Sequence, residues 1–158
     1  MNTAGEKIVE FARKEIGYCE NPPNTNWTKF GLWFGLNQLP WCGIFVSYCY
    51  NQAGYPLGNI GFRKGFAGCQ TAHRYFEDKG EITKTPVPGD IVLYDWNGDG
   101  RFDHTGIFIE MVGTKAFFAV EGNTSLKNNS NGGSVMSRLR NFNDGNIIFV
   151  HPKVLDVL

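Results

Sequence analysis

The chain has 158 residues, a length that suits one domain with a substantial hydrophobic core. Hydrophobic residues make up 42% and charged residues 19%, values that are ordinary for a globular protein. The formal net charge is zero, so the composition supplies neither a basic surface for nucleic acid nor a general attraction to anionic membranes.

A capping box at residues 3–6 begins the first expected helix, which Gly17 would end. Four apolar residues are predicted to form its buried stripe: Ile8, Phe11, Ala12 and Ile16. Glu10 and Arg13 interrupt this stretch, so it lacks the continuous apolar core of a signal peptide. Residues 21–40, which follow, are expected to be rich in loops.

A second helix is predicted for residues 42–53, directly after Pro40-Trp41 and before Gly54. Apolar side chains at positions 42, 45, 46, 49 and 53 follow the spacing of a core-facing helix. Cys42 is therefore expected in or just before the first turn. There, unpaired backbone N–H groups and the positive end of the helix dipole favour a thiolate, which is a nucleophile.

The second half of the chain is dominated by predicted strands. A glycine-rich connection at 58–68 and a short helix at 71–79 precede a turn at residues 86–90. Strands are expected at 91–94, 106–111, 116–120, 134–139 and 146–150. Helices followed by strands indicate an α+β fold, in which N-terminal helices pack on an antiparallel sheet. Residues 1–158 are expected to form one domain.

Polar residues at the ends of two of these strands could act with Cys42. His104 lies where a loop enters a strand, and Glu121 and Asn123 follow an apolar strand. If the chain stays extended through Gly122, Glu121 and Asn123 share one face. Either could anchor an imidazole N–H and aim the other ring nitrogen at sulfur. The sequence leaves open which of the two does so.

These motifs resemble the CHAP domain, a family of cysteine- and histidine-dependent amidohydrolases and peptidases. The resemblance rests on Cys42 at a helix start, on DHTGI around His104 and on EGN at 121–123, and it extends to FVHP at 149–152. It implies a papain-like fold with Cys42 as nucleophile and His104 as base. Glu121 and Asn123 match the third and fourth catalytic positions of the family.

The family implies a function as well, because its members include bacteriophage endolysins and bacterial wall hydrolases. The resemblance implies a peptidoglycan hydrolase that cuts N-acetylmuramoyl-L-alanine or a peptide bond of the stem or crossbridge. The chain shows no wall-binding domain, and we expect a monomer, alone or within a longer parent. Without an export signal or a membrane span, it is expected to be made in the host cytoplasm and to act on the wall after release.

Two alternatives remain at this stage. One is a non-catalytic, calcium-dependent module that binds the cell wall and retains the fold. The other is a papain-like peptidase or deamidase that acts on protein. Loss of function on replacing Cys42 would argue against the first, and activity on cell walls would argue against the second.

The loop before His104 is a candidate calcium site, and some CHAP domains bind calcium. Oxygen-bearing groups alternate along it in an EF-hand-like series, with Gly100 at the sixth position. The candidate ligands are Asp95, Asn97, Asp99, the carbonyl of Arg101, and Asp103. The twelfth position is Gly106 in place of a bidentate Glu, so other groups must complete the shell. The alternative is a polar turn in which Asp and Asn side chains cap backbone groups.

Tryptophans beside these motifs are candidates for a substrate groove. Trp41 and Trp96 are expected to be partly exposed there, whereas Trp27 and Trp33 fit a groove or the core equally well. Three further cysteines are predicted to be structural and not bridged to the nucleophile: Cys19, Cys49 and Cys69.

Overall fold

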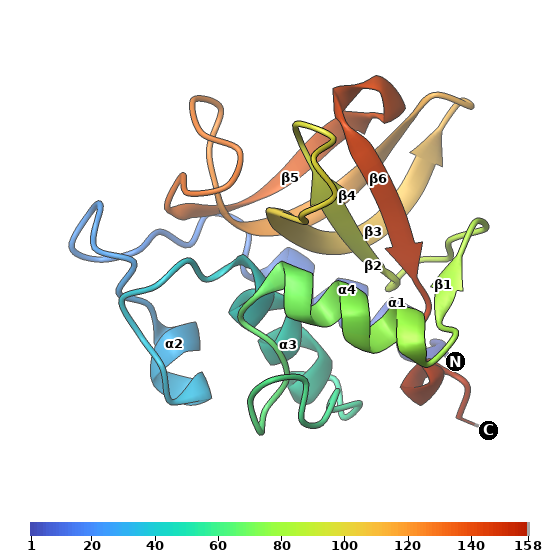
Figure 1. Cartoon of the computed structure of the whole chain (residues 1–158). Helices are drawn as coiled ribbons and strands as arrows, with labels where there is room; N and C mark the ends of the chain where they lie inside the picture. Colours follow the sequence, from blue (N-terminus) through green and yellow to red (C-terminus); the bar gives the residue numbers. More distant parts are fainter. Residues whose placement is uncertain (158) are drawn as a thin grey trace.

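The computed structural model describes residues 1–157, which begin with helices and continue into a sheet (Figure 1). The α-helices are α1 (Ala4–Lys14), α2 (Lys29–Phe34), α3 (Cys42–Gln52) and α4 (Cys69–Asp78). Two short 3-10 helices lie near the C-terminus, η1 (Phe142–Asp144) and η2 (Lys153–Leu155). None of the helices in this part of the chain combines the length and the apolar character that crossing a membrane requires.

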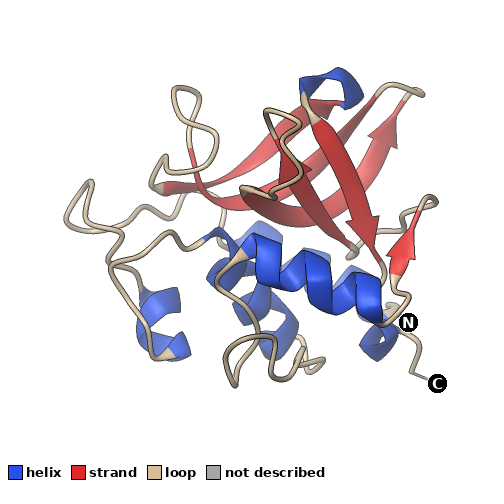
Figure 2. Ribbon diagram, viewed as in Figure 1, coloured by secondary structure: helices blue, strands red, loops and turns tan. Residues whose placement is uncertain are grey.

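The sheet has six strands, and each neighbouring pair is antiparallel. Its strands are β1 (Ile82–Thr83), β2 (Ile91–Asp95), β3 (His104–Val112), β4 (Ala116–Thr124), β5 (Ser134–Asn141) and β6 (Asn146–Val150). Their order across the sheet is β1-β6-β2-β3-β4-β5. Figure 2 shows the α-helices gathered on one side of this curled sheet. The expected α+β class, with N-terminal helices on an antiparallel sheet, is confirmed.

The helix α3 occupies the middle of the main hydrophobic core. Its side chains are buried on several sides, because α1, α2 and the strands β3 and β4 all pack against it. Phe45 of α3, Ile107 of β3 and Val120 of β4 belong to this core. A second apolar cluster, which includes Val92 and Phe117, covers the opposite face of the sheet. The helix α3 is therefore held against β3 and β4.

One local expectation was wrong, and two short elements were not predicted. The first helix ends at Lys14, before Ile16, and Ile16 is 46% exposed and lies outside the stripe. The segment expected to be rich in loops also contains α2, whose first turn is capped by the Thr28 hydroxyl accepting from the Gly31 N–H. The short strand β1 was also missed, because two residues carry almost no alternation to recognise.

Candidate active site

Cys42 is the first residue of α3, as its position after Pro40 predicts. Trp41 is the N-cap residue, and its side chain accepts no capping hydrogen bond. The first backbone N–H groups of the helix therefore have no acceptor from the N-cap side chain. The Cys42 side chain is only 3% exposed. The pKa of its thiol lies well below the ordinary value. A hydrogen bond from Cys69 is the largest cause, and His104 and the Gly43 N–H add to it against the opposing effect of burial.

His104 is the first residue of β3 and pairs across the sheet with Tyr94 of β2. The two rings stack with centroids 5.7 Å apart. Nε2 of His104 lies 2.9 Å from Oε1 of Glu121. Nδ1 is buried and has no hydrogen-bond partner among the described residues. It is therefore the ring nitrogen left to exchange a proton with Cys42, whose charge as a thiolate raises the pKa of the ring.

Glu121 is fully buried on β4 and is held by three side chains. Besides His104, it accepts two hydrogen bonds from the Arg140 guanidinium, one of them from Nε at 2.9 Å. The hydroxyl of Tyr94 donates a third at 2.7 Å. Burial alone would raise the pKa of this carboxyl, yet the charge of His104 and the Arg140 hydrogen bonds outweigh it and lower the pKa to about 2. Glu121 is thus a fixed anion behind the imidazole.

The buried anion changes the protonation of His104. Burial would lower the pKa of the ring, but the negative charge of Glu121 and the interaction with Cys42 raise it to about 9. At neutral pH the ring is therefore an imidazolium beside a thiol whose pKa is depressed. A thiolate–imidazolium pair holds both the nucleophile and the proton that a leaving group needs.

Asn123 takes a different position from the one expected. Its backbone is in the left-handed region with φ of 57°, and the β4–β5 register shifts between Glu121 and Thr124. The extended geometry that would place Glu121 and Asn123 on one face is therefore broken. The Asn123 side chain accepts from the Gly133 N–H at 3.0 Å and donates to Asn131 at 3.1 Å. It holds the loop before β5, and Glu121 is the residue that contacts His104.

The two tryptophans beside the motifs differ in exposure. Trp41 is fully buried and stacks on Phe30 with centroids 5.6 Å apart, so the expectation that it lines an exposed groove is wrong. Trp41 is the N-cap of α3 and lies where the chain enters the core, so its side chain points inward. Trp96 is half-buried, stacks on Tyr94 and lies 6.0 Å from the His104 ring, centroid to centroid. Trp96 therefore remains a candidate for contact with substrate beside the site.

The loop between β2 and β3 is tied together by its own side chains. The buried Asp95 carboxylate accepts from three backbone N–H groups, those of Gly98, Asp99 and Gly100. The remaining candidate calcium ligands are exposed: Asn97, Asp99, Arg101 and Asp103. Within residues 1–157, no three His, Cys, Asp or Glu side chains are grouped as a metal site would need. These side chains suit the capped turn, and calcium binding stays a prediction.

Sequence reasoning missed three residues of the site. Tyr94 and Arg140 hold Glu121, and the Cys69 sulfur lies 3.8 Å from that of Cys42. A strand pattern places Tyr94 and Arg140 on β2 and β5, but it does not show that both strands direct them to Glu121. Strand register is the missing information, because it alone aligns Tyr94 with His104.

Comparison with known proteins agrees with this geometry. The chain is similar over 96% of its length to the crystal structure of a wild-type endolysin, LysIME-EF1, with a TM-score of 0.54 and 12% sequence identity. It spans 65% of the length of that structure, and the likeness concerns the fold. No curated protein matches the sequence. The CHAP domain model matches residues 35–123, which include Cys42, His104 and Glu121 and amount to more than half of the sequence, so the chain belongs to the CHAP domain family.

Proposed function

We propose that this chain is a peptidoglycan hydrolase that cuts an amide bond of the bacterial cell wall by cysteine nucleophilic catalysis. The observation that carries the proposal is the buried series Cys42, His104, Glu121, in a member of the CHAP family. The endolysin likeness of the fold supports a cell-wall substrate. Cys42 is the nucleophile, His104 the general acid and base, and Glu121 the group that orients the ring.

The first half of the reaction forms an acyl-enzyme. The Cys42 thiolate attacks the amide carbonyl carbon, and the carbonyl oxygen becomes an oxyanion. The Cys42 backbone N–H, at the free start of α3, is suited to donate to that oxygen. The His104 imidazolium then gives its proton to the amine nitrogen, the carbon–nitrogen bond breaks, and the amine leaves. A thioester between Cys42 and the acyl group remains.

The second half releases the acyl group. His104 is now neutral and takes a proton from a water molecule, which attacks the thioester carbonyl. Collapse of this intermediate returns the Cys42 thiolate and the His104 imidazolium and yields a carboxylic acid. Arg140 and Tyr94 prevent the Glu121 carboxylate from rotating. Glu121 therefore holds the His104 ring in one orientation throughout the reaction.

The test is turbidity loss of purified Gram-positive cell walls with the native chain and with Cys42→Ala. The replacement should reduce hydrolysis to background while leaving the melting temperature close to that of the native chain. Cys19→Ala is the matched control, because Cys19 is exposed and its sulfur contacts Gly17 and Ser134 and not the buried series. Its activity should equal that of the native chain.

Two outcomes would redirect the proposal. Wall binding without hydrolysis, unchanged by Cys42→Ala, would indicate a non-catalytic wall-binding module. Cleavage of proteins with no effect on walls would indicate a peptidase or deamidase that acts on protein. If walls are cleaved, mass spectrometry of the muropeptides decides between an amidase and an endopeptidase. An amidase frees the amine of L-alanine, whereas an endopeptidase leaves new termini within the stem or crossbridge.

A further inference from the structure

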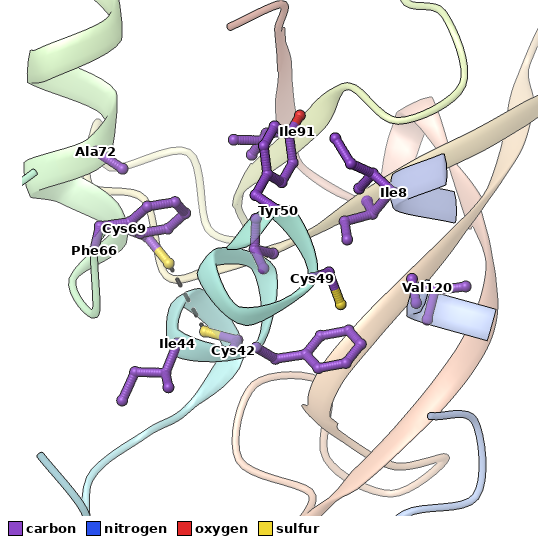
Figure 3. Packing of buried hydrophobic residues seen from close by; sticks show 14 of the residues in the cluster. Ile8, Cys42, Ile44, Cys49, Tyr50, Phe66, Cys69, Ala72, Ile91 and Val120 are labelled. Atoms are coloured by element: carbon purple, nitrogen blue, oxygen red, sulfur yellow. Dashed lines mark hydrogen bonds between the residues drawn. The ribbon is translucent and has the colours of Figure 1, made fainter. Parts of the chain in front are cut away.

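Two free cysteines meet at the candidate nucleophile. Sγ of Cys42 and Sγ of Cys69 lie 3.8 Å apart, as the dashed line in Figure 3 shows. Each is the first residue of a helix, Cys42 of α3 and Cys69 of α4. Both are nearly inaccessible to solvent, at 3% and 6% exposure. Cys69, which was predicted to be structural and not bridged to the nucleophile, is free and lies against the Cys42 sulfur.

The chain holds these two helix starts together by specific contacts. The Ser47 hydroxyl of α3 accepts from the Phe66 N–H at 3.1 Å. Its own proton can reach the Gly43 carbonyl at 2.9 Å or the Phe66 carbonyl at 3.2 Å. A Cβ on Gly43 would meet the Phe66 ring at 2.8 Å and the Ala67 carbonyl at 2.9 Å. Only glycine at position 43 allows the segment before α4 to lie so close. The sulfur–sulfur contact thus follows from how α3 and this segment pack.

We propose that Cys69 is a positioning residue for the nucleophile, whose thiol donates a hydrogen bond to the Cys42 thiolate. This inference rests on the proposed function, in which Cys42 attacks as a thiolate. A thiol is a weak donor to a neutral acceptor, but a buried thiolate is an anion that gains from any donor within reach. The bond would keep the sulfur ionised and hold it beside His104.

The neighbours of each sulfur decide which one carries the charge. Cys42 faces the imidazole of His104 from β3 and the Gly43 N–H from its own helix. Cys69 faces Cys42, and the negative charge of Asp103 acts on it from the loop before β3. The pKa of Cys69 is accordingly raised well above its ordinary value, first by the bond to Cys42 and then by burial. Cys69 therefore keeps its proton and is the donor.

The experiment measures how fast iodoacetamide alkylates Cys42 at each pH, because only the thiolate reacts at an appreciable rate. Mass spectrometry of the peptide that contains Cys42 separates it from the other cysteines. In the native chain, alkylation should persist well below pH 8. In Cys69→Ala the midpoint of the pH profile of Cys42 alkylation should rise by about one pH unit. At pH values below the midpoint, Cys42 should therefore react about tenfold more slowly. Cys69→Ser retains a donor and should keep the native profile.

Controls separate the hydrogen bond from simple packing. Cys69→Thr and Cys69→Val have the same shape and differ in the hydroxyl donor, so they repeat the comparison if the alanine variant fails to fold. Cys19→Ala should leave the profile unchanged. An unshifted profile in Cys69→Ala, or equal shifts in the paired variants with and without a donor, would overturn the proposal. A native Cys42 that reacts only above pH 8 would instead remove the proposed function.

Discussion

The ring of His104 is fixed by Glu121, whose Oε1 lies 2.9 Å from Nε2. Arg140 and Tyr94 hold the same carboxylate, so the orientation of the ring is set by contacts from three other strands. This arrangement gives Glu121 two effects that mutation can separate. Its charge sets the protonation of the ring, and its shape sets the direction of Nδ1.

The first prediction concerns the charge. Glu121→Gln retains an acceptor of similar size but removes the negative charge, so the pKa of His104 should fall from about 9. Hydrolysis at pH 7.5 should fall by about 10²-fold, in the range for a lost general acid. The alkaline limb of the pH–rate profile should move to lower pH. Arg140 would lose its buried partner, so the melting temperature must be measured alongside. An unchanged alkaline limb would contradict this role for Glu121.

The second prediction concerns the pH dependence of folding stability. Folding raises the pKa of His104 from 6.5 to about 9, so its contribution is complete below pH 6.5 and is lost as the pH rises through about 9. Folding lowers the pKa of Glu121 from 4.5 to about 2, so its contribution is present above pH 4.5 and is lost as the pH falls through about 2.

Denaturant unfolding at a series of pH values tests this window. Folding also lowers the pKa of Cys42 well below 9.0, so its contribution opposes that of His104 between pH 6.5 and about 9. The free energy of unfolding should therefore change little across that interval and should decrease as the pH falls from about 4.5 toward 2. The three groups interact, so their contributions form one shared energy and do not add. Glu121→Gln should flatten the decrease on the acid side. A native chain that gains stability from pH 7 to 10 would refute the assignment of the charged pair.

Local sequence could predict the start of α3 and the start of β3, because proline, the helix period and a strand of β-formers all act within a few residues. Cys42 and His104 were therefore located correctly on their elements. The choice between Glu121 and Asn123 depends on a register shift and a positive φ in β4, neither of which has a local pattern. Sequence reasoning accordingly left that choice open.

Contacts between segments that are distant in the sequence could not be predicted, for another reason. The burial of Trp41 depends on Phe30 from α2, a helix within the segment that the sequence predicts to be rich in loops. The approach of Cys69 to Cys42 depends on Gly43 and Ser47 accepting the segment before α4. Neither glycine nor serine within a helix signals such packing by its type alone.

The third prediction concerns the close packing between Gly106 and the Glu121 side chain. A Cβ on Gly106 of β3 would lie 2.6 Å from Cγ of Glu121 and 3.0 Å from the Val120 carbonyl. Gly106→Ala should displace the carboxylate from His104 and lower hydrolysis at least tenfold, because misplacement of this size is costly in an active site. The control is Glu110→Ala, an exposed position on the same strand. Equal activity in the two variants would show that Glu121 tolerates the shift.

The fourth prediction concerns calcium at the β2–β3 loop. If the ion binds there, it stiffens the loop that leads to His104, and EGTA should lower the melting temperature by several degrees and reduce activity. Re-addition of calcium, but not of magnesium, should restore both. Asp99→Ala removes one exposed candidate ligand and should weaken the response to calcium. The same melting temperature and activity with EGTA and with calcium would remove calcium from the description of this domain.

The fifth prediction follows from the distance between the two sulfurs at the site. The Cys42 thiolate attacks hydrogen peroxide, takes one oxygen as a sulfenic acid and releases hydroxide. The Cys69 thiol, 3.8 Å away, then attacks that sulfur and expels water, which leaves a disulfide. In peroxide the native chain should lose activity, and its mass should fall by that of two hydrogen atoms as the disulfide forms. Dithiothreitol should restore both the activity and the mass.

The Cys69→Ser variant has no thiol to complete the bridge. In excess peroxide its Cys42 should proceed to the sulfinic acid, gain two oxygen atoms and stay inactive after dithiothreitol. Cys19→Ala should behave like the native chain, because the exposed cysteine takes no part in the bridge. A native chain that gains two oxygens at Cys42 and yields no linked Cys42–Cys69 peptide would show that the helix starts hold the sulfurs too rigidly to bond.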